Sequence, residues 1–224
     1  MNPLSTKRNK YHSNIKNSTV FTPPGVAQFI YDKAVFPLYC QNRQKTKTFI
    51  VLDPAIGGGN LVKPLEPLTK SKKAYIIGYD IDNYNPEPCD VFFQENFMDV
   101  KRVDAPVSLA IVNPPFNTDE RNREWLKKHK KGKALIPEVF VDKLSELYPK
   151  VPIIMIVPMG FLLNQRKKSN RWKKYSRTQD IKISSILMLP LDAFPGVEFH
   201  CCVVCFNFPE GLLEPFYWFE EKYL

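Results

Sequence analysis

A four-residue turn after an apolar run carries the side chains best suited to hold an amine. Residues 107–112 (VSLAIV) have the pattern of a buried strand, and Asn113, Pro114, Pro115 and Phe116 follow directly. The side-chain carbonyl of Asn113 and the backbone carbonyl of Pro114 are two acceptors for the protons of a planar amine, such as N6 of adenine. Because each proline ring holds φ at about −65°, the acceptors are in place before a substrate arrives. The ring of Phe116 offers a flat face for a base.

An Asn-Pro-Pro turn can also do no more than end a strand. The choice between these two interpretations depends on what else the chain carries, and two further features favour the amine clamp.

The first is a glycine loop directly after the first apolar run. In FIVLDPAIGGGN (49–60), Asp53 precedes Gly57, Gly58 and Gly59. Glycine allows positive φ and a close approach of the backbone to a ligand. The loop has neither the GxGxxG pattern nor the lysine of a phosphate-binding loop. Alone, it is equally typical of a plain turn between a strand and a helix.

The second feature is an acid at the end of the next apolar run, IIGYDID (76–82), where Asp80 stands. A carboxylate at the end of this strand is placed to accept hydrogen bonds from two ribose hydroxyls. Nicotinamide cofactors and S-adenosylmethionine both carry such a ribose. The amine clamp favours S-adenosylmethionine, because a methyl group is what an amine would receive.

The elements that must position these residues are short strands separated by crossovers. Near-continuous apolar runs of this kind indicate a parallel sheet covered on both faces. A short connection with Pro and Gly joins the last two runs, which favours an antiparallel hairpin. We therefore expect an α/β fold, doubly wound, with a mostly parallel seven-stranded sheet and an antiparallel C-terminal hairpin. The expected strands are 48–52, 74–78, 91–93, 107–112, 153–157, 183–189 and 201–206, and a helix is expected over 26–39.

With these features in one chain, the sequence resembles the γ-type adenine-N6 DNA methyltransferases, an S-adenosylmethionine-dependent family with an NPPF motif. The similar segments occur in the order of that family: FTPPGVAQFI (21–30), DPAIGGGN (53–60), GYDID (78–82), ENFMD (95–99) and NPPF (113–116). The resemblance implies a Rossmann-like class I methyltransferase that methylates N6 of an adenine flipped out of DNA.

The resemblance also implies residue roles. It assigns catalysis to Asn113, Pro114, Pro115 and Phe116, and stacking on the target base to Phe116 and Phe194. Asn96 stands where the family usually has aspartate, so its amide oxygen would bind the cofactor adenine. The cofactor-binding positions are Thr22, Pro23, Asp53, Pro54, Ala55, Gly57, Gly59, Asp80, Ile81, Asn96 and Phe97.

Charge and organisation favour a nucleic-acid partner. The formal net charge is +9, which attracts a polyanion but also suits a solvated basic surface. We expect a flexible arm over 1–18 and one domain over 19–224, without a separate target-recognition domain. Basic inserts interrupt the alternation of strands and crossovers at about 117–137 and 164–178. The sequence predicts nucleic-acid contacts for Lys127, Lys128, Lys130, Lys131, Arg166, Lys167, Lys168, Arg171, Trp172, Lys173 and Lys174. Trp125 and Tyr175 are further candidates for stacking on bases.

The sequence disfavours membrane-spanning, secreted, disulfide-rich and metal-dependent proteins. No run approaches the ~18 apolar residues of a membrane span, and the polar N-terminus lacks a signal-peptide core. The five cysteines have no framework spacing, so we interpret them as reduced residues of an intracellular, cytoplasmic protein. The three histidines are scattered, and methyl transfer to an amine requires no metal.

Three alternatives remain open. An RNA adenine-N6 methyltransferase could use the same turn, and a protein-glutamine methyltransferase could bind a side-chain amide there. An inactive subunit could retain the fold for docking nucleic acid. A partner protein could supply sequence recognition, and a restriction–modification, phage or plasmid origin fits the resemblance.

Overall fold

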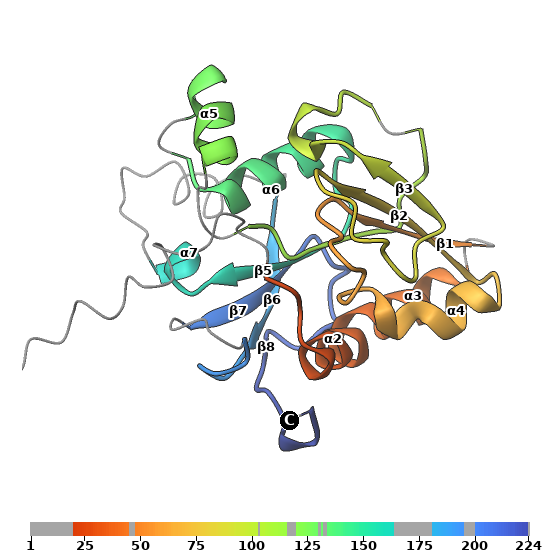
Figure 1. Ribbon diagram of the computed structural model, residues 1–224. Coiled ribbons are helices and arrows are strands. Elements are labelled where there is room, and N and C mark those ends of the chain that lie inside the picture. Colours follow the sequence, from red (N-terminus) through yellow and green to blue (C-terminus); the bar gives the residue numbers. More distant parts are fainter. Residues whose placement is uncertain are drawn as a thin grey trace, which may run out of the picture.

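One mixed sheet organises the protein in the computed structural model, which describes residues 20–44, 48–102, 104–115, 120–129, 131, 134–163, 181–194 and 200–223. Its strand order is β3-β2-β1-β4-β5-β7-β6-β8 (Figure 1). The strands β1 to β5 pair in parallel, whereas β7 runs antiparallel between β5 and β6. The expected fold class, including the C-terminal hairpin, is confirmed.

The strands fall within two residues of their expected bounds, with one addition. The sheet has eight strands rather than seven, because Phe216–Tyr217 pairs in parallel with β6 as β8. Two residues are too few for a recognisable apolar alternation, so the sequence pattern did not reveal this edge strand. The strands are β1 Phe49–Asp53, β2 Ala74–Asp80, β3 Val91–Gln94, β4 Leu109–Val112, β5 Ile153–Pro158, β6 Ile183–Met188, β7 Cys201–Phe206 and β8 Phe216–Tyr217.

The helix expected over 26–39 is a continuous stretch with a wider turn in its middle. It consists of α2 Pro24–Ile30, a π-helical turn Tyr31–Val35 and α3 Phe36–Asn42. The N–H of Phe36 bonds to the carbonyl of Tyr31 at π spacing. A regular α-helix would require residue 37 to donate its N–H to the carbonyl of Lys33, but Pro37 has no N–H. The change to π spacing just before Pro37 accommodates this missing bond.

The remaining helices are short. They are α4 Glu66–Lys70, α5 Glu120–Lys128, α6 Ile136–Leu147, α7 Gly160–Leu163 and the 3₁₀ turns η3 Lys63–Leu65, η4 Phe97–Asp99 and η5 Glu221–Tyr223. No helix among the described residues is long and apolar enough to span a membrane.

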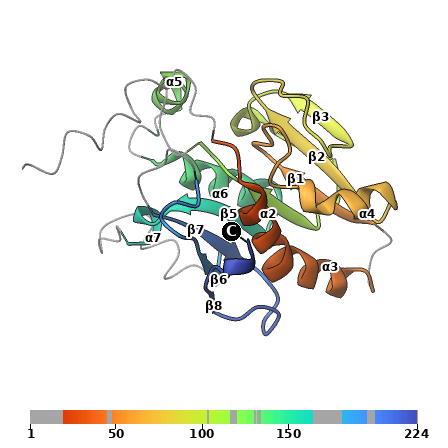
Figure 2. The same cartoon turned by 60° about the horizontal axis from the view of Figure 1, so that its bottom comes forward.

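Apolar side chains fill both faces of the sheet. One core cluster joins α2 and α3 to the sheet, and the other joins α5, α6 and α7 to the opposite face. Figure 2 shows the C-terminal segment beside α2, where the hydroxyl of Tyr223 donates to Asp32 at 2.8 Å. Cys201, Cys202 and Cys205 lie fully inside β7, as expected of core residues.

The strand order creates the place for a site. The chain winds outward from β1 in one direction through β2 and β3, and in the other through β4 and β5. In doubly wound sheets, ligands bind outside the carboxyl ends of the strands at such a switch point. The glycine loop after β1, Asp80 at the end of β2 and Asn113 after β4 all lie at this edge.

Candidate active site

A cavity of about 240 Å³ opens at the carboxyl edge of the sheet. It brings together segments that are far apart in the sequence, including all three features singled out above. Its lining consists of Val20, Phe21, Thr22, Pro54, Ala55, Ile56, Gly57, Asn60, Leu61, Asp80, Ile81, Asp82, Glu95, Asn96, Phe97, Met98, Asn113, Pro114, Pro115, Arg121, Asn122 and Phe140.

Asp80 holds the glycine loop against the end of β2. One carboxylate oxygen accepts the N–H of Gly57 at 2.9 Å, and the other accepts the N–H of Asp82 at 3.1 Å. Burial raises the pKa of Asp80, while these two backbone donors act to lower it. Because a carboxylate has about four acceptor positions, Asp80 keeps acceptor capacity for a ligand.

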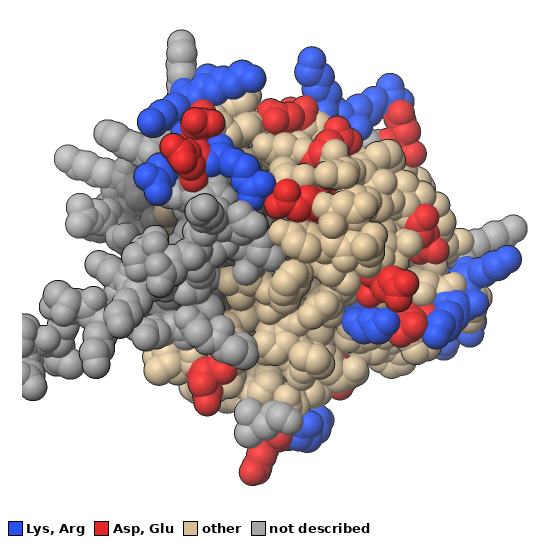
Figure 3. Space-filling view, viewed as in Figure 1, with Lys and Arg blue, Asp and Glu red and all other residues tan. Residues whose placement is uncertain are grey.

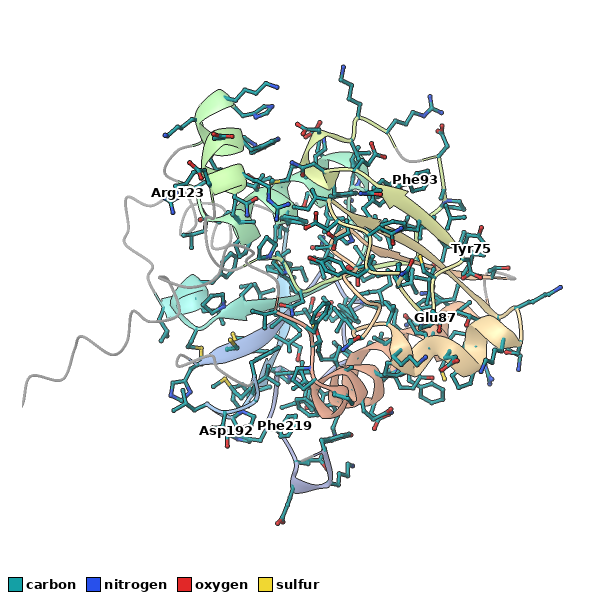
Figure 4. The ribbon with its side chains drawn as sticks, viewed as in Figure 1. Tyr75, Glu87, Phe93, Arg123, Asp192 and Phe219 are labelled. Carbon is teal, nitrogen blue, oxygen red and sulfur yellow. The ribbon has the colours of Figure 1, made fainter. Side chains whose placement is uncertain are left out.

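The glycine loop owes its shape to two residues in the left-handed region. Gly57 has φ +52° and lies under the ring of Phe21, while Gly59 has φ +86°. A Cβ on Gly59 would lie 2.6 Å from the carbonyl oxygen of Glu87, a residue labelled in Figure 4. Gly59 therefore lets the 83–90 loop close over the glycine loop, and it does not line the cavity.

Asp53 supports the site from below and does not line it. Its side chain is 1% exposed, and one oxygen accepts the N–H of Ala55 at 3.1 Å. The other oxygen has no partner among the described residues. Burial raises the pKa of Asp53 to about 8, the Ala55 N–H lowers it, and the nearby charge of Asp80 raises it.

The side chain of Asn113 is held in one orientation. Its amide nitrogen donates to the carbonyl of Val20 at 2.9 Å and to the hydroxyl of Thr22 at 3.2 Å. Because a backbone carbonyl can only accept, the contact with Val20 identifies the nitrogen end of the amide. The oxygen Oδ1 is buried and has no partner among the residues that the structure describes. It is an acceptor with unused capacity on a residue that lines the cavity.

Two residues expected to bind a cofactor have other contacts. Thr22 lines the cavity but is only 3% exposed, and its hydroxyl positions Asn113. Pro23 caps the start of α2 and borders a separate groove with Asp192 and Tyr223. The segment 22–24 therefore anchors the turn after β4 to α2.

Asn96 and Phe97 lie where expected, but the amide of Asn96 is already engaged. Its oxygen accepts the N–H of Met98 at 3.0 Å and so caps η4. Phe97 is 1% exposed and packs edge-on against Tyr79 at 5.3 Å. Pro54, Ala55 and Ile81 line the cavity as predicted.

Of the expected base-stacking pair, only Phe194 lies among the described residues. Pro114 and Pro115 line the cavity, whereas Phe116 lies outside the described residues. The expectation for Phe194 is corrected. Its ring is 2% exposed, belongs to the core cluster with α2 and does not line the cavity. Its loop lies beside the C-terminal segment, where Asp192 and Phe219 are labelled in Figure 4. Both faces of the ring are covered, so a base cannot stack on it in this arrangement.

The described part of the first basic insert forms α5. Lys127 and Lys128 are exposed on its last turn, and Lys131 follows it. Figure 3 shows Lys and Arg side chains at this end of the molecule, with acidic side chains among them. Trp125 does not face outward as a base-stacking residue would. Its indole is stacked on His129 at 4.0 Å and donates to Asp99 at 2.7 Å.

The other predicted nucleic-acid contacts lie outside the described residues. They are Lys130, Arg166, Lys167, Lys168, Arg171, Trp172, Lys173 and Lys174, together with Tyr175.

The cavity also contains residues that the sequence did not single out. Glu95 and Asp82 stand beside predicted residues, so their neighbours could have pointed to them. Arg121, Asn122 and Phe140 come from helices whose approach to this edge no local pattern reveals. No cluster of His, Cys, Asp and Glu suited to a metal occurs among the described residues.

No protein-family model and no curated protein matches the chain, but its fold is similar to that of several solved structures. A protein from Listeria monocytogenes described as a class I S-adenosylmethionine-dependent methyltransferase matches with a TM-score of 0.60 and 17% identity, over 93% of this chain and 68% of that one. A type I restriction–modification methyltransferase subunit from Streptococcus thermophilus matches with 0.59 and 12%, over 86% of this chain and 45% of that one.

A protein described as a modification subunit of a type I restriction enzyme, from Vibrio vulnificus, has a TM-score of 0.60 and 17% identity, over 91% of this chain and 50% of that one. The chain thus spans about half the length of the two subunits. At these identities the likeness concerns the fold, which is the Rossmann-like fold of class I methyltransferases.

Proposed function

We propose that this chain transfers a methyl group from S-adenosylmethionine to the N6 amine of an adenine in DNA. The observation that carries the proposal is the unpaired oxygen of Asn113, a buried acceptor held in the wall of the cavity. A buried acceptor without a partner costs about 1–3 kcal/mol. Such an atom is retained where a ligand with a hydrogen-bond donor completes it.

The residues at the glycine loop fit the proposed cofactor. Asp80 keeps acceptor capacity for the ribose hydroxyls, and Gly57, which has no side chain, adds backbone to the cavity lining. Phe97 and Ile81 supply apolar surface for the adenine ring of the cofactor, and the amide of Asn96 is a hydrogen-bonding group beside them. When bound, S-adenosylmethionine supplies an electrophilic methyl group on a sulfonium.

The residues of the turn then act on the substrate amine. Asn113 Oδ1 and the carbonyl of Pro114 accept hydrogen bonds from its two N–H groups, which favours a pyramidal nitrogen with an available lone pair. With S-adenosylmethionine bound, its sulfonium would supply the methyl group in exchange for one amine proton, while Asn113 and Pro114 would hold the amine facing it. Because Val20 and Thr22 fix the amide beforehand, no reorganisation is needed during the reaction.

DNA is the proposed substrate on two grounds. The exposed lysines of α5 give this end of the molecule the charge that phosphates require. Two of the proteins with a similar fold are named as restriction–modification subunits, and DNA is what such systems modify. An adenine must leave its stack to reach the cavity, at a cost of a few kcal/mol.

A methyl-transfer assay on the full chain tests the proposal. Labelled methyl incorporation is measured on duplex DNA, single-stranded DNA and RNA, with wild-type protein and with Asn113→Ala. We expect labelled adenine in duplex DNA and a loss of at least about 100-fold in turnover for the variant, as when one preorganised polar contact to a reacting group is removed. The cofactor dissociation constant, measured by calorimetry, should change by less than about threefold.

Asn83→Ala is the matched control, since it makes the same change on a neighbouring loop outside the cavity lining, and it should retain turnover. Near-full turnover of Asn113→Ala would refute the clamp. Labelling of RNA in preference to DNA would overturn the choice of substrate, and cofactor binding without any transfer would favour an inactive binding subunit.

We also propose that a partner protein supplies the reading of the target sequence. The two restriction–modification proteins of similar fold are named as subunits of larger enzymes. Mapping methylated adenines in DNA treated with the chain alone tests this. Methylation scattered over many sequence contexts is expected, and methylation confined to one short sequence would contradict it.

A further inference from the structure

Helix α5 is weakly anchored by apolar contacts. Of its nine residues, Asn122 and Leu126 are buried, and Trp125 is half-buried. A helix this short is marginal in isolation, and one buried leucine supplies little hydrophobic attachment. Its position therefore depends on the polar contacts that it makes.

Among those polar contacts are two carboxylates, Asp82 in the cavity lining and Asp99 beside it. Arg121 Nη1 lies 3.2 Å from Asp82 Oδ2, two residues beyond Asp80. Trp125 Nε1 donates to Asp99 Oδ1 at 2.7 Å, and the stacked His129 places Nε2 3.7 Å from the same oxygen. Asp99 ends η4, the turn whose Phe97 and Met98 line the cavity.

The two ends of α5 contribute to different surfaces of the molecule. Its first turn is part of the cavity wall, because Arg121 and Asn122 line it. Its last turn carries Lys127 and Lys128, with Lys131 just beyond. At 1.5 Å per residue, Arg121 and Lys127 are only about 9 Å apart along the axis. One short rigid element thus connects the cavity to the basic surface, where Arg123 is labelled in Figure 4.

We propose that α5 couples cofactor binding to nucleic-acid binding, with Arg121 and Trp125 as positioning residues. The coupling rests on the proposed function. A ligand in the cavity contacts the rim segments that carry Asp82 and Asp99, which holds α5 in its docked position and so presents its lysines in a fixed arrangement. By linkage, a nucleic acid that binds those lysines stabilises the same docked position and tightens cofactor binding by the same factor.

The experiment measures the dissociation constant of S-adenosylmethionine by calorimetry, with and without a saturating DNA duplex, on the full chain. For the wild-type protein we expect the duplex to tighten cofactor binding at least fivefold, the lower end of typical coupling between sites. Trp125→Phe keeps an aromatic ring but removes the N–H that bonds to Asp99. We expect its enhancement to fall below about twofold, with its cofactor affinity in the absence of DNA within about twofold of wild type.

Asp99→Ala removes the same contact from the other side and should give the same result. Two matched controls should keep the wild-type enhancement: Trp218→Phe, whose side chain is 72% exposed near β8, and Asp104→Ala, an exposed acid. Thermal melting of each variant shows that it is folded. Asn113→Ala should lose turnover yet keep the enhancement, because Asn113 is hydrogen-bonded to Val20 and Thr22 rather than to α5.

An equal cofactor affinity with and without duplex in the wild type would overturn the coupling while leaving methyl transfer intact. Full enhancement in both Trp125→Phe and Asp99→Ala would also overturn it. A chain that binds no cofactor would fail the proposed function itself, and the coupling with it.

Discussion

Two buried polar atoms at the carboxyl edge of the sheet belong to residues with different roles, one that supports the loop and one that faces the substrate chemistry. Asp53 Oδ2 and Asn113 Oδ1 are both buried without a partner in the described part of the chain. Asn113 lines the cavity and its amide nitrogen is fixed by two acceptors, which leaves its oxygen for a substrate. Asp53 lies beneath the glycine loop, and its pKa is raised to about 8. An unpaired buried carboxyl is more stable protonated, so Asp53 holds the loop as a neutral acid.

The raised pKa of Asp53 predicts how stability changes with pH. An acid whose pKa is higher in the folded state stabilises the fold below its unfolded value of 3.8, and this contribution is lost as pH rises toward about 8. Asp53→Asn mimics the neutral form at every pH. From pH 4 to pH 8 the variant should therefore gain up to about 5 kcal/mol on the wild type in free energy of unfolding.

Urea unfolding of the cofactor-free protein at these two pH values measures the difference. Asp104→Asn, the same change at an exposed carboxylate, should run parallel to the wild type. If Asp53→Asn also runs parallel, Asp53 is ionised in the folded protein and the interpretation is wrong.

At the scale of elements, the glycine loop shows where local sequence pattern is no longer sufficient to predict the structure. A run of three glycines predicts a loop but not which of them requires glycine. The structure separates them, since Gly59 has φ +86° and backbone of Glu87 within 2.6 Å of its Cβ position, whereas Gly58 has only ordinary contacts beginning at 3.4 Å.

Gly59→Ala should therefore destabilise the protein much more than Gly58→Ala. The left-handed conformation costs about 1–2 kcal/mol for a residue with a Cβ, and the clash with the backbone of Glu87 adds to it. We expect a loss of roughly 2–4 kcal/mol for Gly59→Ala and less than about 1 kcal/mol for Gly58→Ala. Denaturant unfolding measures both, and equal losses would show that the 83–90 loop moves aside without cost.

At the scale of the whole molecule, charge is distributed unevenly. The net charge is +9, yet the C-terminal segment after β7 carries Glu210, Glu214, Glu220 and Glu221 against Lys222. Helix α5, which carries Lys127 and Lys128, lies at the opposite end of the molecule from the C-terminus (Figure 1). A nucleic acid should therefore meet the protein at the α5 end.

This arrangement predicts the salt dependence of DNA binding. Each neutralised phosphate contributes about −0.9 to the slope of log K against log salt for duplex DNA. Replacing Lys127 and Lys128 together by Ala should reduce the steepness of that slope by about 1.8. Replacing Lys70 and Lys73, which lie at the amino end of β2, should leave the slope unchanged. Fluorescence anisotropy over a salt series measures all three proteins, and an unchanged slope for the α5 variant would place the DNA elsewhere.

The amino-acid sequence by itself determined seven of the eight strands, the class of fold and the three segments that meet at the cavity. These follow from local properties, because apolar runs, turn residues and terminal acids are recognisable without knowing what packs against them. The sequence could also identify Asn113 as an acceptor, since amide chemistry and proline stiffness are properties of the turn itself.

Only the tertiary structure decided what each of these residues contacts. It moved Phe194 into the core, turned Thr22 toward Asn113, engaged the oxygen of Asn96 with Met98 and brought Arg121 and Phe140 to the cavity. The physical reason is that burial and partnership are properties of pairs of segments distant in the chain. A side chain's chemistry is carried by its own position, whereas its exposure and its hydrogen-bond partners are set by whichever element the fold places against it.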